Sequence, residues 1–210
     1  MSESKRVIML GNEAIARGAY EAGVKVSAAY PGTPSTEISE YLVQYRDDLY
    51  CEWSPNEKVA TEVAIGASIA GTRAMSCMKH VGFNVAADPA YTVSYMGVNG
   101  GLVIVVADDP GLYSSQNEQD TRMVARAAHL PVLEPSDSAE AKEFMKLAFD
   151  LSEQFDRPFV YRTTTRLAHS QGLVELCERE EGPDKPYERD PAKNVMMPGN
   201  AKGRHVVIER

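Results

Sequence analysis

Cysteine is scarce in this sequence, and its three cysteines, Cys51, Cys77 and Cys177, lie far apart. No Cys-x-x-Cys pair and no cluster of cysteines and histidines occurs among the 210 residues. Zinc sites, iron–sulfur clusters and disulfide frameworks depend on such closely spaced ligands or pairs. The sequence therefore predicts a chain without metal ligands, clusters or disulfides of its own.

An excess of basic charge and long apolar runs are also missing. The formal net charge is −8, which argues against a nucleic-acid or membrane-surface role. No run approaches the roughly 18–20 apolar residues of a membrane span. The N-terminal residues Met1–Arg6 are not followed by an apolar stretch long enough for a signal peptide. These absences predict a cytoplasmic protein that binds neither nucleic acid nor membrane.

The glycine patterns of several common sites do not occur. No Gly-x-Gly-x-x-Gly follows a predicted strand, and neither a P-loop nor a Gly-x-Ser-x-Gly elbow is present. Gly97, Gly100 and Gly101 instead fit the end of a helix and the start of a strand. A dinucleotide-binding or α/β-hydrolase site of the usual kind is therefore not expected.

The hydrophobic pattern alternates between short apolar strands and amphipathic helices along most of the chain. The predicted strands cover residues 24–30, 49–53, 73–78, 102–107, 132–133 and 159–163. Residues 102–107 are uniformly apolar, which is typical of a strand covered on both faces. This alternation predicts an α/β fold, a three-layer αβα sandwich with a parallel sheet. A change to proline-rich, charged sequence predicts an extended linker or docking tail over 178–210, after an α/β domain over 1–177.

One predicted helix, over residues 54–71, carries a carboxylate in its first turn. With Ser54 as N-cap and Pro55 at the first position, Glu57 completes a Ser-x-x-Glu capping box. Alternatively, Glu57 points out of the helix end into a cleft and bonds a ligand nitrogen. Gly66 costs roughly 1 kcal/mol against alanine in a helix interior, so we expect a packing reason for it.

Polar residues collect in the loops that follow the predicted strands. In open parallel sheets, ligands bind beyond the carboxyl ends of the strands. The unusual side chains in those loops are Thr33, Glu57, His80, Ser114, Ser115, Gln116 and Asn117. Each also has a plain structural interpretation, such as an N-cap for Thr33 and a satisfied loop histidine for His80. The clustering favours a functional site.

Several segments together resemble the N-terminal part of the alpha subunit of indolepyruvate ferredoxin oxidoreductase. This family belongs to the thiamine diphosphate-dependent 2-oxoacid:ferredoxin oxidoreductases. The similar segments are Leu10–Gly18, Tyr30–Glu37, Asn56–Ala60, Met78–Pro89, Ala107–Gly111 and Ser114–Arg122. The resemblance extends from about residue 6 to the tail, and it implies the pyrimidine-binding type of the thiamine diphosphate-binding fold.

The resemblance also implies roles for particular residues. Glu57 matches the catalytic glutamate that bonds N1′ of the aminopyrimidine, and Thr33 matches a threonine that faces the substrate carboxylate in relatives. His80 replaces a small hydroxyl residue and is inferred to line the substrate side. The implied cofactor-binding residues are Pro31, Gly32, Thr33, Glu57, His80 and Gly82, and the implied substrate-binding residues are Thr33, His80 and Gln116. The implied reaction is oxidative decarboxylation of an arylpyruvate to acyl-CoA.

The chain departs from the family pattern in ways that imply missing parts. It has no Gly-Asp-Gly with a later asparagine for Mg²⁺ and diphosphate and no cysteine motif for 4Fe-4S clusters. Those groups are expected in a diphosphate-binding domain and a cluster-bearing region or subunit. Ferredoxin, coenzyme A and a second copy of this chain in a homodimer are expected partners, and the chain alone is expected to be inactive.

Pyruvate-type relatives carry an arginine near the end of the strand that here ends at Ala107–Asp109. If that arginine binds the substrate carboxylate in relatives, this chain needs another cation, which Arg122, Lys79 or a partner could supply. Two alternatives to the main hypothesis remain open. The chain could be a subunit of a split non-oxidative 2-oxoacid decarboxylase, or a non-catalytic docking module in which Glu57 only caps its helix.

Overall fold

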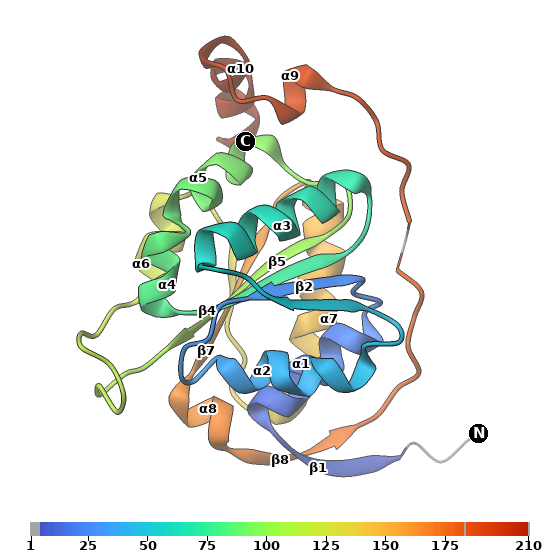
Figure 1. The fold of residues 1–210 in the computed structure, drawn as a ribbon, viewed down its shortest axis with the longest axis vertical. Coiled ribbons are helices and arrows are strands. Elements are labelled where there is room, and N and C mark those ends of the chain that lie inside the picture. The colour runs from blue at the N-terminus through green and yellow to red at the C-terminus, as the bar shows by residue number, and fades with distance from the viewer. Residues whose placement is uncertain (1–4, 183, 210) are drawn as a thin grey trace.

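The computed structural model describes residues 5–182 and 184–209. Its centre is a six-stranded sheet in the order β3-β2-β4-β5-β7-β6, in which every neighbouring pair is parallel (Figure 1). The strands are β2 (Val26–Ala29), β3 (Tyr50–Trp53), β4 (Ala74–Lys79), β5 (Leu102–Asp108), β6 (Val132–Leu133) and β7 (Phe159–Thr164). The prediction of a parallel α/β sheet is confirmed.

Helices cover both faces of this sheet. The helices on one face are α1 (Gly11–Glu21), α2 (Thr36–Leu42) and α7 (Ser138–Phe155), and those on the other are α3 (Glu57–Ala70), α4 (His80–Val85), α5 (Ala87–Met96) and α6 (Thr121–Ala127). Strand β5 shows the three layers most clearly. Its Val103 and Val105 lie in the core under α1 and α7, whereas Ile104 and Val106 lie in the core under α4 and α6. All four are fully buried, which confirms that this strand is covered on both faces.

A second, two-stranded antiparallel sheet pairs β1 (Arg6–Leu10) with β8 (Gln171–Glu175). The chain reaches β8 from β7 through the short helix α8 (Thr165–His169), and α2 is followed by the 3₁₀ turn η1 (Val43–Tyr45). Among the described residues, no helix is long and apolar enough to cross a lipid bilayer.

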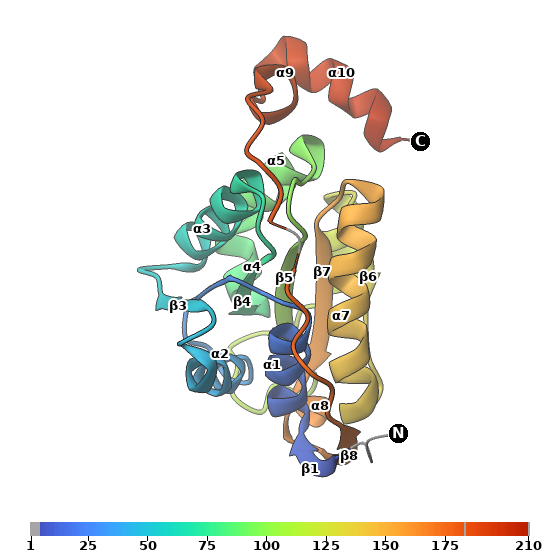
Figure 2. The same cartoon turned by 90° about the vertical axis from the view of Figure 1, so that its right-hand side faces the viewer.

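After β8 the chain runs along one side of the domain and ends in α9 (Pro191–Asn194) and α10 (Pro198–Ile208), beside α5 (Figures 1 and 2). The backbone N–H of Glu180 donates to the carbonyl of Glu21 at 2.9 Å, and that of Lys185 donates to Gly71 at 3.0 Å. A Cβ atom on Gly71, whose φ is +106°, would lie 1.8 Å from the Lys185 carbonyl. The tail therefore docks on its own chain, while the boundary at residue 177 stays a prediction.

The central helix begins later than the sequence suggests. Helix α3 starts at Glu57, and Asn56 is its N-cap, with Oδ1 accepting from the Val59 N–H at 3.0 Å. The Ser54 hydroxyl instead donates to Glu52 at 2.6 Å, and the Ser54 N–H donates to the Ala29 carbonyl at 2.8 Å. The capping-box interpretation of Glu57 is therefore wrong, because Ser54 extends the pairing of β3 with β2.

Gly66 also differs from expectation. It is exposed on α3, and apart from the adjoining backbone of α3 itself, no heavy atom of the described residues lies within 4 Å of the place where its Cβ would stand. Glycine costs a helix interior about 0.5–1 kcal/mol relative to alanine. We therefore expect Gly66→Ala to raise the free energy of unfolding of this chain by about that amount, measured by urea denaturation. An unchanged or lowered denaturation midpoint would contradict this account of Gly66.

Candidate active site at the carboxyl edge of the sheet

Four loops and one helix start meet where β2, β4, β5 and β7 end. The strands are parallel, so residues 30–36, 79–83, 109–120 and 164–170 all leave the sheet at the same edge. The chain enters α3 from the end of β3 at this edge too, which brings Glu57 to it. The loops expected from the sequence are therefore together at one edge.

Glu57 is the first residue of α3, and its side chain is 8% exposed. Its carboxylate lies directly against the bare Cα of Gly82 in α4. A Cβ added to Gly82 would stand 2.4 Å from Glu57 Oε1 and 2.6 Å from Glu57 Cγ. Within the described part of the chain, the Glu57 carboxylate has no hydrogen-bond or ion-pair partner. It does not cap α3, because Asn56 does so, and it does not bond Ser54, whose hydroxyl donates to Glu52. An almost buried carboxylate without a partner is available to a ligand donor.

The loop after β2 closes over the stem of Lys79. A Cβ on Gly32 would lie 2.9 Å from Lys79 Cβ, so only glycine permits this approach. The Ser35 hydroxyl donates to the Gly32 carbonyl at 2.6 Å, and the Gly32 N–H donates to Thr36 Oγ1 at 2.9 Å. Helix α2 begins at Thr36 after Ser35, so Thr33 is not its N-cap. Thr33 and Pro31 are exposed at the rim of the edge.

His80 is 1% exposed and is the first residue of α4, so it lies in a helix and not in a loop as its plain structural interpretation expected. Its Nε2 lies 3.1 Å from the Asn117 carbonyl. A carbonyl oxygen only accepts hydrogen bonds, so Nε2 carries the proton. In the neutral ring Nδ1 is then an acceptor, and this atom is buried without a partner among the described residues. Gln116 is exposed, and its role stays a prediction.

The loop over residues 109–120 is held in place by Asp109, which is 2% exposed. Its carboxylate accepts hydrogen bonds from the Ser114 N–H at 2.8 Å, the Ser115 hydroxyl at 2.6 Å and the Thr165 hydroxyl at 2.7 Å. Burial opposes ionisation of Asp109, but these hydrogen bonds outweigh it and lower its pKa to about 2. The same loop then presents the Ser114 carbonyl to Lys79 Nζ at 2.7 Å.

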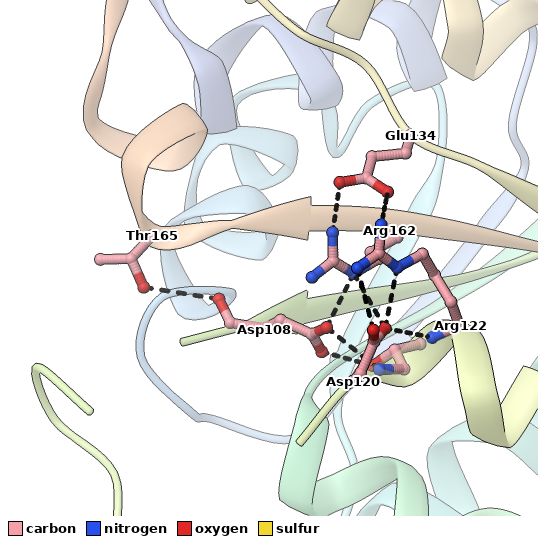
Figure 3. Close-up of polar contacts among 7 residues, drawn as sticks. Asp108, Asp120, Arg122, Glu134, Arg162 and Thr165 are labelled. Carbon is pink, nitrogen blue, oxygen red and sulfur yellow. Dashed lines mark hydrogen bonds and ion pairs between the residues drawn. The ribbon is translucent and has the colours of Figure 1, made fainter. Parts of the chain in front are cut away.

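An ion-pair network with a buried centre at Asp108 and Arg162 lies next to this loop (Figure 3). Asp108, which is 0% exposed, accepts from Arg162 Nε at 2.7 Å and from the Thr121 N–H at 3.1 Å. Arg162 also pairs with Glu134, and Arg122 pairs with Asp120 at 2.9 Å and with Glu134 at 3.5 Å. Both candidate cations from the sequence are therefore engaged, Arg122 by two carboxylates and Lys79 by a carbonyl.

A cavity of about 590 Å³ opens at the ends of β5 and β7, beside the Asp109 loop. It is lined by Pro110, Tyr113, Thr164, Thr165, Arg166, His169 and Ser170. Sequence reasoning pointed to the loop after β7 but singled out none of its residues. The signal that could have found them is the run of three threonines at the end of β7, which Arg166 and His169 follow closely.

Comparison with curated proteins finds close relatives. An indolepyruvate oxidoreductase subunit IorA from Archaeoglobus fulgidus is 54% identical over 218 residues, covering 100% of this chain and 35% of the relative. The corresponding subunit from Pyrococcus abyssi is 53% identical, covering 96% of this chain and 32% of the relative. A 2-oxoglutarate synthase subunit KorA from Methanothermobacter thermautotrophicus is 27% identical, covering 85% of this chain and 51% of its own length. The chain thus spans about a third of the IorA relatives.

The fold matches that of a 2-oxoglutarate:ferredoxin oxidoreductase from Magnetococcus marinus, with a TM-score of 0.80 and 17% sequence identity over 100% of this chain and 45% of the other. The family model described as "Pyruvate flavodoxin/ferredoxin oxidoreductase, thiamine diP-bdg" matches residues 17–207, which is most of the sequence. The chain therefore belongs to the thiamine diphosphate-binding family of the pyruvate flavodoxin/ferredoxin oxidoreductases.

Proposed function

We propose that this chain is the pyrimidine-binding part of an indolepyruvate-type ferredoxin oxidoreductase, which decarboxylates an arylpyruvate oxidatively to an acyl-CoA. The observation that carries the proposal is the carboxylate of Glu57, nearly buried against Gly82 and without a partner among the described residues. The family match supports a thiamine diphosphate site, and the names of the 54% and 53% identical relatives favour an indolepyruvate-type substrate.

The residues at the edge fit the pyrimidine end of thiamine diphosphate. A protonated ring nitrogen needs a carboxylate that is not already satisfied, and Glu57 is such a group. Gly82 has no side chain, so the Glu57 carboxylate fits against its backbone, and Gly32 likewise leaves room for the stem of Lys79. In the alternative of a docking module, Glu57 would cap its helix, but Asn56 does so instead.

When bound, thiamine diphosphate supplies the electron sink for decarboxylation of a 2-oxoacid. Glu57 would accept and return a proton at N1′ of the aminopyrimidine, because its carboxylate has no other partner among the described residues. His80, fixed by the Asn117 carbonyl, offers Nδ1 as an acceptor. Thr33 lies at the exposed rim, where a substrate would enter.

The rest of the enzyme lies outside this chain in the proposal. Mg²⁺ and the diphosphate belong to a diphosphate-binding domain, and 4Fe-4S clusters belong to a cluster-bearing region or subunit. Ferredoxin and coenzyme A serve the complete cytoplasmic enzyme. In the complete enzyme, two copies of this chain would form a homodimer. This chain alone would be inactive.

Gly82→Ala tests the proposed site in the full-length enzyme with its partner subunits. The added methyl group displaces the Glu57 carboxylate, since it would otherwise stand 2.4 Å from Oε1. A misplacement of about 1 Å can cost about 10²-fold in rate, so we expect a fall of that order in kcat for arylpyruvate decarboxylation. Gly66→Ala is the matched control, because its methyl group meets no described atom and should leave kcat unchanged. Equal kcat values for the two variants would refute the assignment of Glu57.

A further inference from the structure

Arg166 is a cation without a partner in the cavity beside the candidate site. It is exposed, and no described residue forms a hydrogen bond or ion pair with its guanidinium. The other cations near this edge are engaged. Lys79 donates to the Ser114 carbonyl, Arg122 pairs with Asp120 and Glu134, and Arg162 pairs with Asp108 and Glu134. Arg166 is thus the guanidinium at this edge that a ligand can reach among residues 5–182 and 184–209.

The cavity around Arg166 suits an anion. None of its lining residues is acidic, although the whole chain has a net charge of −8. His169 adds an imidazole and Ser170 adds a hydroxyl, and both side chains can donate hydrogen bonds. A guanidinium binds a carboxylate through two parallel hydrogen bonds, which makes it more selective than a point charge. Tyr113, which is 80% exposed, adds an aromatic wall with Pro110.

The cavity is close to the groups that the proposed reaction uses. Strands β5 and β7 pair with Asp108 opposite Thr164, and β5 pairs on its other side with β4, with Ala107 opposite Lys79. The ends of β4 and β7 are therefore two strand spacings apart, about 10 Å. Asp109 connects the two places, because it binds Thr165 at the cavity and Ser114 next to Lys79. Figure 3 shows Thr165 and Asp108 side by side at the strand ends, with the Thr165 hydroxyl 3.4 Å from the Asp108 carbonyl.

We propose that Arg166 binds the carboxylate of the 2-oxoacid and that Tyr113 and Pro110 contact its aromatic group. This assignment rests on the proposed function. It names a specificity-determining residue that is separate from Glu57. The cavity around Arg166 has a volume of about 590 Å³, which lies within the range of roughly 300–1,000 Å³ that is usual for small-molecule sites.

The test compares Arg166→Gln, Arg166→Lys and the control Arg126→Gln in the full-length enzyme with its partner subunits. Arg126 is also exposed and has no partner among the described residues, but it lies on α6 outside this cavity. We expect Arg166→Gln to raise KM for phenylpyruvate or indolepyruvate by about 10- to 100-fold, the effect of one charge-assisted contact. The affinity for thiamine diphosphate should not change, Arg166→Lys should restore part of the loss, and Arg126→Gln should behave as wild type.

A second measurement separates anion recognition from a merely structural role. Inhibition constants are compared for an arylpropionate and its uncharged amide. The wild type should prefer the carboxylate, and Arg166→Gln should lose that preference. An unchanged KM, or equal weakening of both inhibitors, would overturn the assignment of Arg166 alone. Failure of the wild-type enzyme to decarboxylate any arylpyruvate with thiamine diphosphate present would overturn the proposed function and this assignment together.

Discussion

Glu57→Gln is expected to lower kcat for arylpyruvate decarboxylation in the full-length enzyme by about 10²- to 10⁴-fold, the usual contribution of a positioned general acid or base. Glutamine keeps the shape of the side chain but cannot share a proton with N1′. The fold should survive, because the Glu57 carboxylate bonds no described residue and Asn56 caps α3. The loss should appear in single-turnover measurements at saturating substrate and cofactor.

Glu62→Gln is the matched control for this variant. Glu62 lies exposed on the same helix and pairs weakly with Lys58, at 3.9 Å. It should leave kcat unchanged. The unfolding free energy of Glu57→Gln should stay within about 1 kcal/mol of wild type, the scale of a charge near a helix N-terminus. Retention of full turnover by Glu57→Gln would show that this carboxylate is not catalytic.

Arg162→Met is expected to have the largest effect on stability. It leaves Asp108, which is 0% exposed, without its cation and with Thr121 alone as donor. Removal of one partner from a buried ion pair typically costs about 3–5 kcal/mol. The fall in unfolding free energy should be measured by urea denaturation of this chain. The loop over 109–120 should loosen as well, because Asp108 holds its far end through Thr121.

The double variant Asp108→Asn/Arg162→Met separates the buried charge from the lost packing. It removes both charges of the closest pair, so it should be more stable than Arg162→Met alone. If Arg162→Met costs less than about 1 kcal/mol, the pair is not the buried anchor described here.

The fold was largely predictable because it follows from local pattern. The apolar run over 102–107 indicated a strand covered on both faces, and the structure buries its side chains alternately under two helical layers. The meeting of the strand-end loops followed from parallel pairing alone. Boundaries were less predictable. Ser54 and Asn56 can both cap a helix, and Asn56 does so because Ser54 is occupied by Ala29 and Glu52. The contact between Ser54 and Glu52 is local in the sequence, whereas the contact between Ser54 and Ala29 depends on the pairing of β3 with β2.

The polar details of the site depend on residues far apart in the sequence. One of the three hydrogen-bond donors to the Asp109 carboxylate is Thr165, which is 56 residues away in the sequence. The sequence offered Arg122 as a cation for the substrate carboxylate, but in the structure Asp120 and Glu134 neutralise its charge. Arg166 did not stand out in the sequence, because its importance comes from the neutralisation of those other cations. Such information appears only when the loops are placed at one edge.

The most direct test of the central claim is the nitrogen-15 NMR spectrum of thiamine diphosphate labelled at N1′ and bound to the full-length enzyme. If Glu57 shares a proton with N1′, the wild-type signal should be shifted from that of the free cofactor in the direction of a protonated or strongly hydrogen-bonded nitrogen, and Glu57→Gln should return most of the shift. An N1′ signal that is the same in wild type and Glu57→Gln, with the cofactor bound to both, would contradict the account.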